Sequence, residues 1–307
     1  MRKLLGLIAI GVLLSIAQLA SAGPLEDGVS AQKRGQFDTA LRLFRPLAEV
    51  GNAPAQYNLG IMYANGDGVS RDYAEAMKWF RQAADQGFAD ALFNLGAMYF
   101  KGEGVPRDYA EAAKWFRKAA DQESADAQYN LGVMYDKGQG VPRNRAEAAK
   151  WFRKAADQRF AYAQFSLGEM YANGEGVSQD DAEAAKWFHK AADQGDAVAQ
   201  YNLAVMYSNG KGVSQDDAAA MGWFRQAAEQ GLADAQYRLG LMYAKGQGVA
   251  QDQIQAHKWL SLAASRITAA ERDEAVRIRD GMAATMTPAQ IAEAQRLAGE
   301  WKPTVGH

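Results

Sequence analysis

The chain of 307 residues contains no cysteine and only three histidines. Without thiols it can form neither a disulfide nor a thiolate, which excludes cysteine-ligated metals and cysteine nucleophiles. His189, His257 and His307 belong to no cluster with carboxylates at the spacing of metal ligands, and no fixed nucleophile accompanies them. We therefore predict a protein without a metal, a cofactor or catalytic residues.

An excess of charge of either sign is also missing. The chain has 34 lysines and arginines against 36 aspartates and glutamates, which gives a formal net charge of −2. Domains that bind nucleic acids usually carry a basic excess concentrated on one face. The sequence therefore predicts no nucleic-acid partner.

Long apolar runs are missing except near the N-terminus. Arg2 and Lys3 precede an apolar stretch at residues 4–14, and small residues follow at 20–22. This order is typical of a secretory signal peptide. We expect cleavage after Ala22, a mature chain that is periplasmic or secreted, and no membrane attachment after cleavage. An uncleaved membrane anchor is the alternative.

A block of 36 residues recurs six times without an insertion or a deletion. One position of the block holds a leucine followed by glycine or alanine, and another holds six of the seven tryptophans. The leucine pairs are Leu59-Gly60, Leu95-Gly96, Leu131-Gly132, Leu167-Gly168, Leu203-Ala204 and Leu239-Gly240, and the tryptophans are Trp79, Trp115, Trp151, Trp187, Trp223 and Trp259. A unit of this size cannot bury its apolar face alone, so successive units must stack. The sequence therefore predicts a solenoid.

One copy of the block illustrates the expected secondary structure. Apolar and small residues recur at helical spacing in Ala125–Lys137, and Gly138 follows as a stop signal. Asn144 is predicted to cap a second helix, in which Glu147 closes a capping box and Trp151 lies on the buried face. The same box is expected at Asp72/Glu75, Asp108/Glu111, Asp180/Glu183, Thr268/Glu271 and Thr287/Gln290. Lysines and arginines of the second helices are expected to pair with acidic residues three or four positions away.

The pattern A-x-A-Q-Y-N-L-G-x-M-Y, followed by G-x-G-V and then by K-W-F-x-x-A-A, resembles the Sel-one-like repeat (SLR), a relative of the tetratricopeptide repeat. The resemblance implies an all-α fold, a right-handed α/α superhelical solenoid of six 36-residue helix-turn-helix repeats over residues 51–266. A degenerate half repeat is expected at 23–50, capping helices at 267–301 and a tail at 302–307. Such repeats are associated with protein binding in a concave groove lined by the first helices.

Two sets of residues are candidates for contacting a partner in the groove. Asparagines recur at Asn58, Asn94, Asn130 and Asn202, and the row is interrupted by Ser166 and Arg238. An asparagine side chain offers one acceptor and two donors, enough to bind the backbone of an extended peptide. Tyr162, Glu169 and Phe100 depart from the repeat consensus and are candidate specificity residues. A structural role for the asparagines and local repacking of the aromatic residues are the alternatives.

These features favour a non-enzymatic adaptor or regulator, expected to be monomeric, that binds a protein or peptide in the bacterial envelope. One alternative is a cell-wall-directed protein that binds or hydrolyses peptidoglycan fragments or β-lactams. Two segments, Ser30-Ala31-Gln32-Lys33 and Ser208-Asn209-Gly210-Lys211, match the S-x-x-K motif of serine β-lactamases, although the accompanying S-D-N and K-T-G motifs are absent. A second alternative is a scaffold for envelope assembly or exopolysaccharide export.

Overall fold

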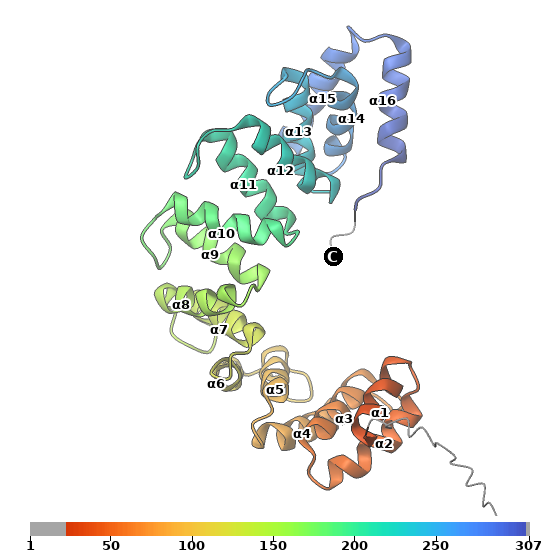
Figure 1. Ribbon diagram of the computed structural model, residues 1–307, viewed down its shortest axis with the longest axis vertical. Coiled ribbons are helices and arrows are strands. Elements are labelled where there is room, and N and C mark those ends of the chain that lie inside the picture. Colours follow the sequence, from red (N-terminus) through yellow and green to blue (C-terminus); the bar gives the residue numbers. More distant parts are fainter. Residues whose placement is uncertain (1–22, 305–307) are drawn as a thin grey trace, which may run out of the picture. The chain divides into compact units, whose positions relative to one another are not determined.

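The computed structural model describes residues 23–304, which form sixteen α-helices and no β-strand (Figure 1). The expected signal peptide, residues 1–22, lies outside the described residues. None of the helices between residues 23 and 304 is long and apolar enough to cross a membrane. The described chain is all-α, as the sequence predicts.

Each 36-residue block contributes a first helix and a second helix. The first helices are α3 (Ala53–Asn65), α5 (Ala89–Lys101), α7 (Ala125–Lys137), α9 (Ala161–Asn173), α11 (Ala197–Asn209) and α13 (Ala233–Lys245). The second helices are α4 (Tyr73–Asp85), α6 (Tyr109–Ala120), α8 (Arg145–Asp157), α10 (Asp181–Asp193), α12 (Asp217–Glu229) and α14 (Gln253–Ala264). The predicted bounds of the helix at Ala125–Lys137 are confirmed.

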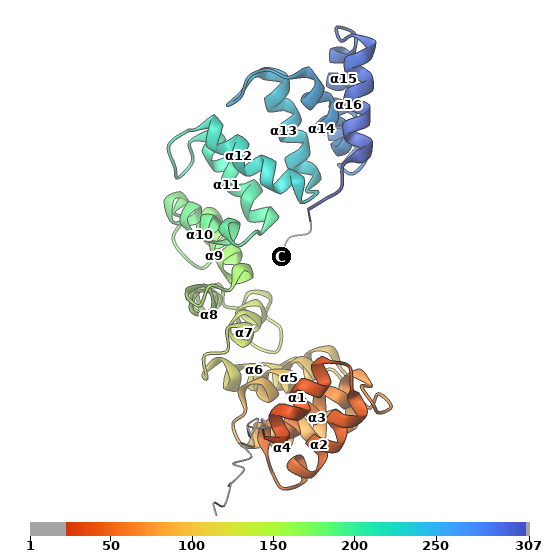
Figure 2. The same ribbon diagram turned by 45° about the vertical axis from the view of Figure 1, so that its right-hand side comes forward.

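Four further helices flank the repeats. At the N-terminal end, α1 (Pro24–Lys33) packs on α2 (Phe37–Glu49), and at the C-terminal end α15 (Ala269–Ala283) is followed by α16 (Pro288–Glu300). Both ribbon views show α16 beside α14 (Figure 2). Beyond α16, the Trp301 ring packs edge-on against Trp259, with 6.3 Å between centroids. The C-terminal helices therefore cover the last repeat.

The contacts divide the chain after Ala91, within α5, into two compact units. Unit 1, described from residue 23 to 91, holds α1 to α4 and the first turn of α5. Unit 2, described from residue 92 to 304, holds the rest of α5 and the helices up to α16. In unit 1, successive helices from α1 to α4 pack on one another, and in unit 2 the same holds from α6 to α15, whereas α16 packs on α14.

Close backbone approaches explain why small residues recur at fixed positions. A Cβ atom added to Gly132 on α7 would lie 2.7 Å from ring atoms of Phe152 on α8, so the two helices can pack this closely only on glycine. Leu131 is fully buried in the same layer, and Trp151 is only 4% exposed, so the predicted buried face is confirmed. In the turn, a Cβ on Gly140 would lie 2.1 Å from the carbonyl oxygen of Tyr109 in the preceding second helix.

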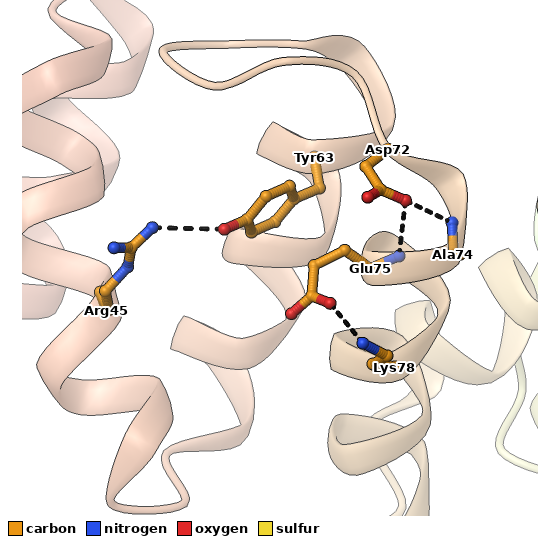
Figure 3. A network of polar contacts seen from close by, with 6 residues as sticks. All are labelled: Arg45, Tyr63, Asp72, Ala74, Glu75 and Lys78. Atoms are coloured by element: carbon orange, nitrogen blue, oxygen red, sulfur yellow. Dashed lines mark hydrogen bonds and ion pairs between the residues drawn. The ribbon is translucent and has the colours of Figure 1, made fainter.

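The second helices begin at an N-cap, but the predicted capping boxes do not close. Asn144 Oδ1 accepts the backbone N–H of Glu147 at 3.0 Å, as predicted. The backbone N–H of Asn144 already donates to the carbonyl of Tyr135 at 2.9 Å, so Glu147 pairs instead with Lys150 at 3.0 Å. Figure 3 shows the equivalent arrangement around Asp72.

At the C-terminal helices the two expected boxes have different outcomes. Thr287 and Gln290 form a complete capping box at the start of α16, as predicted. The box at Thr268 is wrong, because its hydroxyl bonds the Glu271 carboxylate at 2.8 Å and caps no backbone N–H of α15.

A buried glutamine joins successive repeats. Gln128 on α7 is 3% exposed, and its amide nitrogen donates to the carbonyl of Ala120 at the end of the preceding second helix, at 3.2 Å. Its amide oxygen accepts from Gln158 Nε2 at 2.8 Å. Buried amides need such partners, because an unpaired polar group in the core costs stability. The same amide chain recurs at Gln56/Gln86, Gln164/Gln194 and Gln200/Gln230.

Arginines of the second helices form a second link between repeats. Arg117 on α6 donates to the hydroxyl of Tyr135 on α7, and its guanidinium lies 5.3 Å from the Trp151 ring centroid on α8. Arg153 repeats both contacts with Tyr171 and Trp187. The tyrosine contact recurs at Arg225/Tyr243 and at Arg45/Tyr63, drawn in Figure 3. The expectation that these arginines pair with acidic residues is therefore wrong for Arg117 and Arg153, because the aromatic rings of the next repeat lie within reach.

Candidate binding surface

The exposed sides of α7, α9, α11 and α13 in unit 2 form the surface that we call the first-helix face. One repeat position on it holds Asn130, Ser166, Asn202 and Arg238, of which the first three are half-buried and Arg238 is exposed. Asn130 Nδ2 donates to the carbonyl of Asp126 in its own helix at 2.8 Å. This bond fixes the side chain and leaves the amide oxygen and one N–H for other partners.

The other asparagines of the predicted row are also half-buried. Asn58 in unit 1 bonds its own helix through the carbonyl of Pro54 at 2.8 Å, as Asn130 does in unit 2. Asn94 lies on the part of α5 that belongs to unit 2.

Tyr162 is the most exposed large apolar side chain of unit 2, with 63% of its surface accessible. Its ring packs against Phe160, at 5.9 Å between centroids, and against Tyr129 of α7, at 6.1 Å. Tyr129 and Phe160 are 5.3 Å apart, so the three rings form one aromatic cluster. Val198, at the Tyr162 position of the next repeat, is 45% exposed. The first-helix face therefore presents a supported ring and a neighbouring aliphatic side chain to solvent.

Glu169 places a negative charge on the same helix two turns after Tyr162. Partial burial of its carboxyl raises its pKa, and the nearby carboxylates of Glu175 and Asp196 raise the pKa further. No cation pairs with Glu169 among residues 23–304, whereas Glu175 pairs with Arg145 at 2.8 Å. An unpaired carboxylate among other acidic groups favours a basic ligand.

Two further residues of the predicted set have different surroundings. Arg238 lines a pocket of about 200 Å³ between α11 and α13, together with Val205 and Leu241. Phe100 is half-buried, and its ring packs 5.0 Å from Tyr109 within its own repeat. Tyr162, Glu169 and Arg238 are thus exposed on unit 2, while the Phe100 ring is partly occupied by packing.

One S-x-x-K segment lies on α1, and the other spans the end of α11 and the turn that follows it. Ser30 and Lys33 are exposed on α1. Lys211 pairs with Asp181 at 3.1 Å, in the turn that follows α11. Within the described ranges, no group of three or more histidine and acidic side chains is placed to hold a metal ion.

The Sel1 repeat matches the chain over six consecutive segments, residues 53–88, 89–124, 125–160, 161–196, 197–232 and 233–266. The chain belongs to the Sel1 repeat family. The resemblance to SLR proteins and the all-α repeat solenoid predicted from it are confirmed. Proteins of this family are typically interaction scaffolds rather than enzymes.

The structure of one similar chain agrees with this assignment. A Sel1 repeat protein from Oxalobacter formigenes is 33% identical, with a TM-score of 0.67, over 79% of this chain and 97% of its own. A protective antigen of uropathogenic Escherichia coli with an SLR fold is 25% identical, with a TM-score of 0.47, over 90% of this chain and 94% of its own. No protein of curated function matches the chain.

The sequence indicates Tyr162 and Glu169 because they break the repeat consensus, but it does not reveal the side chains that hold the Tyr162 ring in place. Tyr129 occupies a consensus position and therefore gave no signal, although it carries the Tyr162 ring. Burial raises the pKa of the Tyr129 hydroxyl, and a hydrogen bond with Ser166 opposes that rise. Ser166, which interrupts the asparagine row, thus contacts the aromatic cluster through Tyr129.

Proposed function

We propose that this protein is a non-enzymatic scaffold that binds a segment of a partner protein on the first-helix face of unit 2. The observation that carries the proposal is the Tyr162 ring, which is held by two other rings yet remains 63% exposed. A preordered aromatic ring contributes contact area at a small entropic cost, which is why such rings dominate protein interfaces. The family assignment supports the same class of function.

The surroundings of Tyr162 define the chemistry of the partner segment. An apolar side chain fits beside Tyr162 and Val198, and a lysine or arginine nearby in the same segment pairs with the unpaired carboxylate of Glu169. Asn130 bonds the peptide backbone through the amide groups that its intrahelical bond leaves free, and Asn202 bonds it in the same way at the next asparagine of the row. The partner is therefore an extended segment with adjacent apolar and basic residues.

A display selection with random peptides tests this function directly. Peptides selected on the wild-type protein should be enriched in lysine or arginine next to an apolar residue, and Tyr162→Ala should weaken their binding by about tenfold or more. Val50→Ala is the matched control, because Val50 is 82% exposed but lies in unit 1. Equal binding to wild type, Tyr162→Ala and Val50→Ala would place the interaction elsewhere.

We further propose that the protein acts in the periplasm or after secretion. The support is the order of a basic start, an apolar stretch and small residues within positions 1–22. N-terminal sequencing of protein from the envelope fraction of a bacterial host should find Gly23 as the first residue. Recovery of a chain that still begins at Met1 would reject cleavage.

A further inference from the structure

Among the second helices that are followed by another repeat, only α10 lacks the arginine that links successive repeats. Arg117 and Arg153 each bond a tyrosine of the next first helix and lie over a tryptophan of the next second helix. At the same position of α10 stands His189. Its shorter side chain bonds Asp193 at 3.0 Å and meets the edge of Trp223, at 5.4 Å between ring centroids.

The change leaves one partner of the missing arginine, the hydroxyl of Tyr207, available. Tyr207 corresponds to Tyr171, and no side chain within the described part of the chain bonds its hydroxyl. Trp223 corresponds to Trp187, but its ring is already in contact with the imidazole of His189. A pocket of about 540 Å³ opens between α10 and α11, lined by Ala185, His189, Leu203, Tyr207 and Val213.

We propose that this pocket binds an arginine side chain of a partner protein, which takes the place that Arg117 and Arg153 occupy in their own repeats. The guanidinium donates to the Tyr207 hydroxyl and lies over the Tyr207 ring, as that of Arg153 does at Tyr171. The aliphatic stem of the side chain packs on Leu203 and Val213. This site lies between α10 and α11 and is independent of the Tyr162 surface.

Two lysines also line the pocket, but their charges are already engaged. Lys186 pairs with Glu183 at 3.1 Å, and Lys190 lies 3.8 Å from the centroid of the Trp187 ring. The corresponding lysines, Lys150 and Lys154, make the same two contacts on the helix that carries Arg153. Because Arg153 is accommodated in that ionic environment, a guanidinium from outside fits the equivalent place in the next repeat.

The shape of the pocket favours arginine over lysine. The two internal arginines use one planar group both to bond a hydroxyl and to face an aromatic ring. A lysine ammonium is a compact charge that cannot span the two contacts in the same way. An apolar side chain would fill the pocket without reaching the hydroxyl of Tyr207.

The test uses N-acetyl-L-arginine amide as the probe and ligand-observed NMR on the full mature chain. The wild type should bind the arginine probe more tightly than the matching lysine and leucine probes. His189→Arg should weaken this binding by about tenfold or more, because the chain then fills its own pocket with the residue of the neighbouring repeats. Tyr207→Phe should weaken it severalfold by removing only the hydroxyl.

A variant that should gain a binding site provides a second test. Arg153→His should open an equivalent pocket beside Tyr171 and add a second binding site for the arginine probe. Tyr162→Ala should leave probe binding unchanged, which separates this inference from the proposed peptide surface. Unchanged binding to His189→Arg would overturn the proposal. Equal binding of the lysine and arginine probes would show unspecific attraction of cations. Stronger binding of the leucine probe would show an apolar pocket. Either result would also overturn the proposal.

Discussion

Replacing Trp151 with alanine should destabilise unit 2 by about 3–5 kcal/mol. A tryptophan buries roughly 150–250 Å², which at about 25 cal/mol per Å² corresponds to about 4–6 kcal/mol, part of which alanine retains. Trp151 is 4% exposed, and the Arg117 guanidinium and the Lys154 ammonium lie 5.3 Å and 4.1 Å from its ring centroid. The substitution therefore removes both core area and the end of the arginine link.

Urea denaturation followed by circular dichroism measures the loss, and hydrogen exchange locates it. Protection should fall first in α7 and α8, because stability in a repeat array depends on contacts between neighbours. Trp223→Ala is the control, since Trp223 is only half-buried and lacks a cation over its ring in the described part of the chain; its cost should be clearly smaller. An unchanged denaturation midpoint for Trp151→Ala would refute the assignment of the tryptophan row to the core.

Three other predictions concern packing, the asparagine row and pH. Gly132→Ala should destabilise unit 2 by about 1–3 kcal/mol, because the new methyl group would press on Phe152. Gly299→Ala is the control, because its methyl group meets open space and should not change the stability. Equal melting temperatures of the two variants would contradict this prediction. Replacing Asn94, Asn130 and Asn202 together with alanine should weaken peptide binding about a hundredfold while the stability stays nearly constant. The reason is that each lost hydrogen bond contributes about 1 kcal/mol to binding. A loss of stability at unchanged affinity would show that the three asparagines have only a structural role. Because the pKa of Glu169 is raised, binding of a basic peptide should decline as pH falls through that raised pKa, and Glu169→Gln should abolish this dependence. The raised pKa also means that folding disfavours the charged form of Glu169, so Glu169→Gln should slightly stabilise the protein at a pH above that pKa. If the affinity of the wild type for the basic peptide does not depend on pH, the Glu169 carboxylate takes no part in binding.

The sequence predicts local features well because their causes lie close together in the chain. The bounds of α7 follow from apolar spacing and from Gly138, whose left-handed backbone ends the helix. The capping box at Asn144 fails because a distant group, the carbonyl of Tyr135, already accepts the N–H that the box would use. A repeat consensus shows which residues recur but not which atoms they engage.

The links between repeats could not be predicted for the same reason. Arg117 reaches Tyr135 in one helix and Trp151 in the next, and no spacing rule within a single helix connects these residues. The replacement of arginine by His189 is visible in the sequence, yet its effect depends on knowing what the arginine holds elsewhere. On the candidate surface, the exposure of Tyr162 likewise depends on Tyr129 from the preceding repeat.

The tight contact of Gly140 with the backbone of Tyr109 also limits how the chain can change in length. Gly176, Gly212 and Gly248 make the same contact with the start of the second helix in the preceding repeat. An extra residue in any of these turns would shift the glycine off that backbone and place a side chain where none fits. Growth and shortening of the array are therefore restricted to steps of one whole repeat, after which every turn again meets the helix it fits. Alleles that differ in length should differ by multiples of 36 residues.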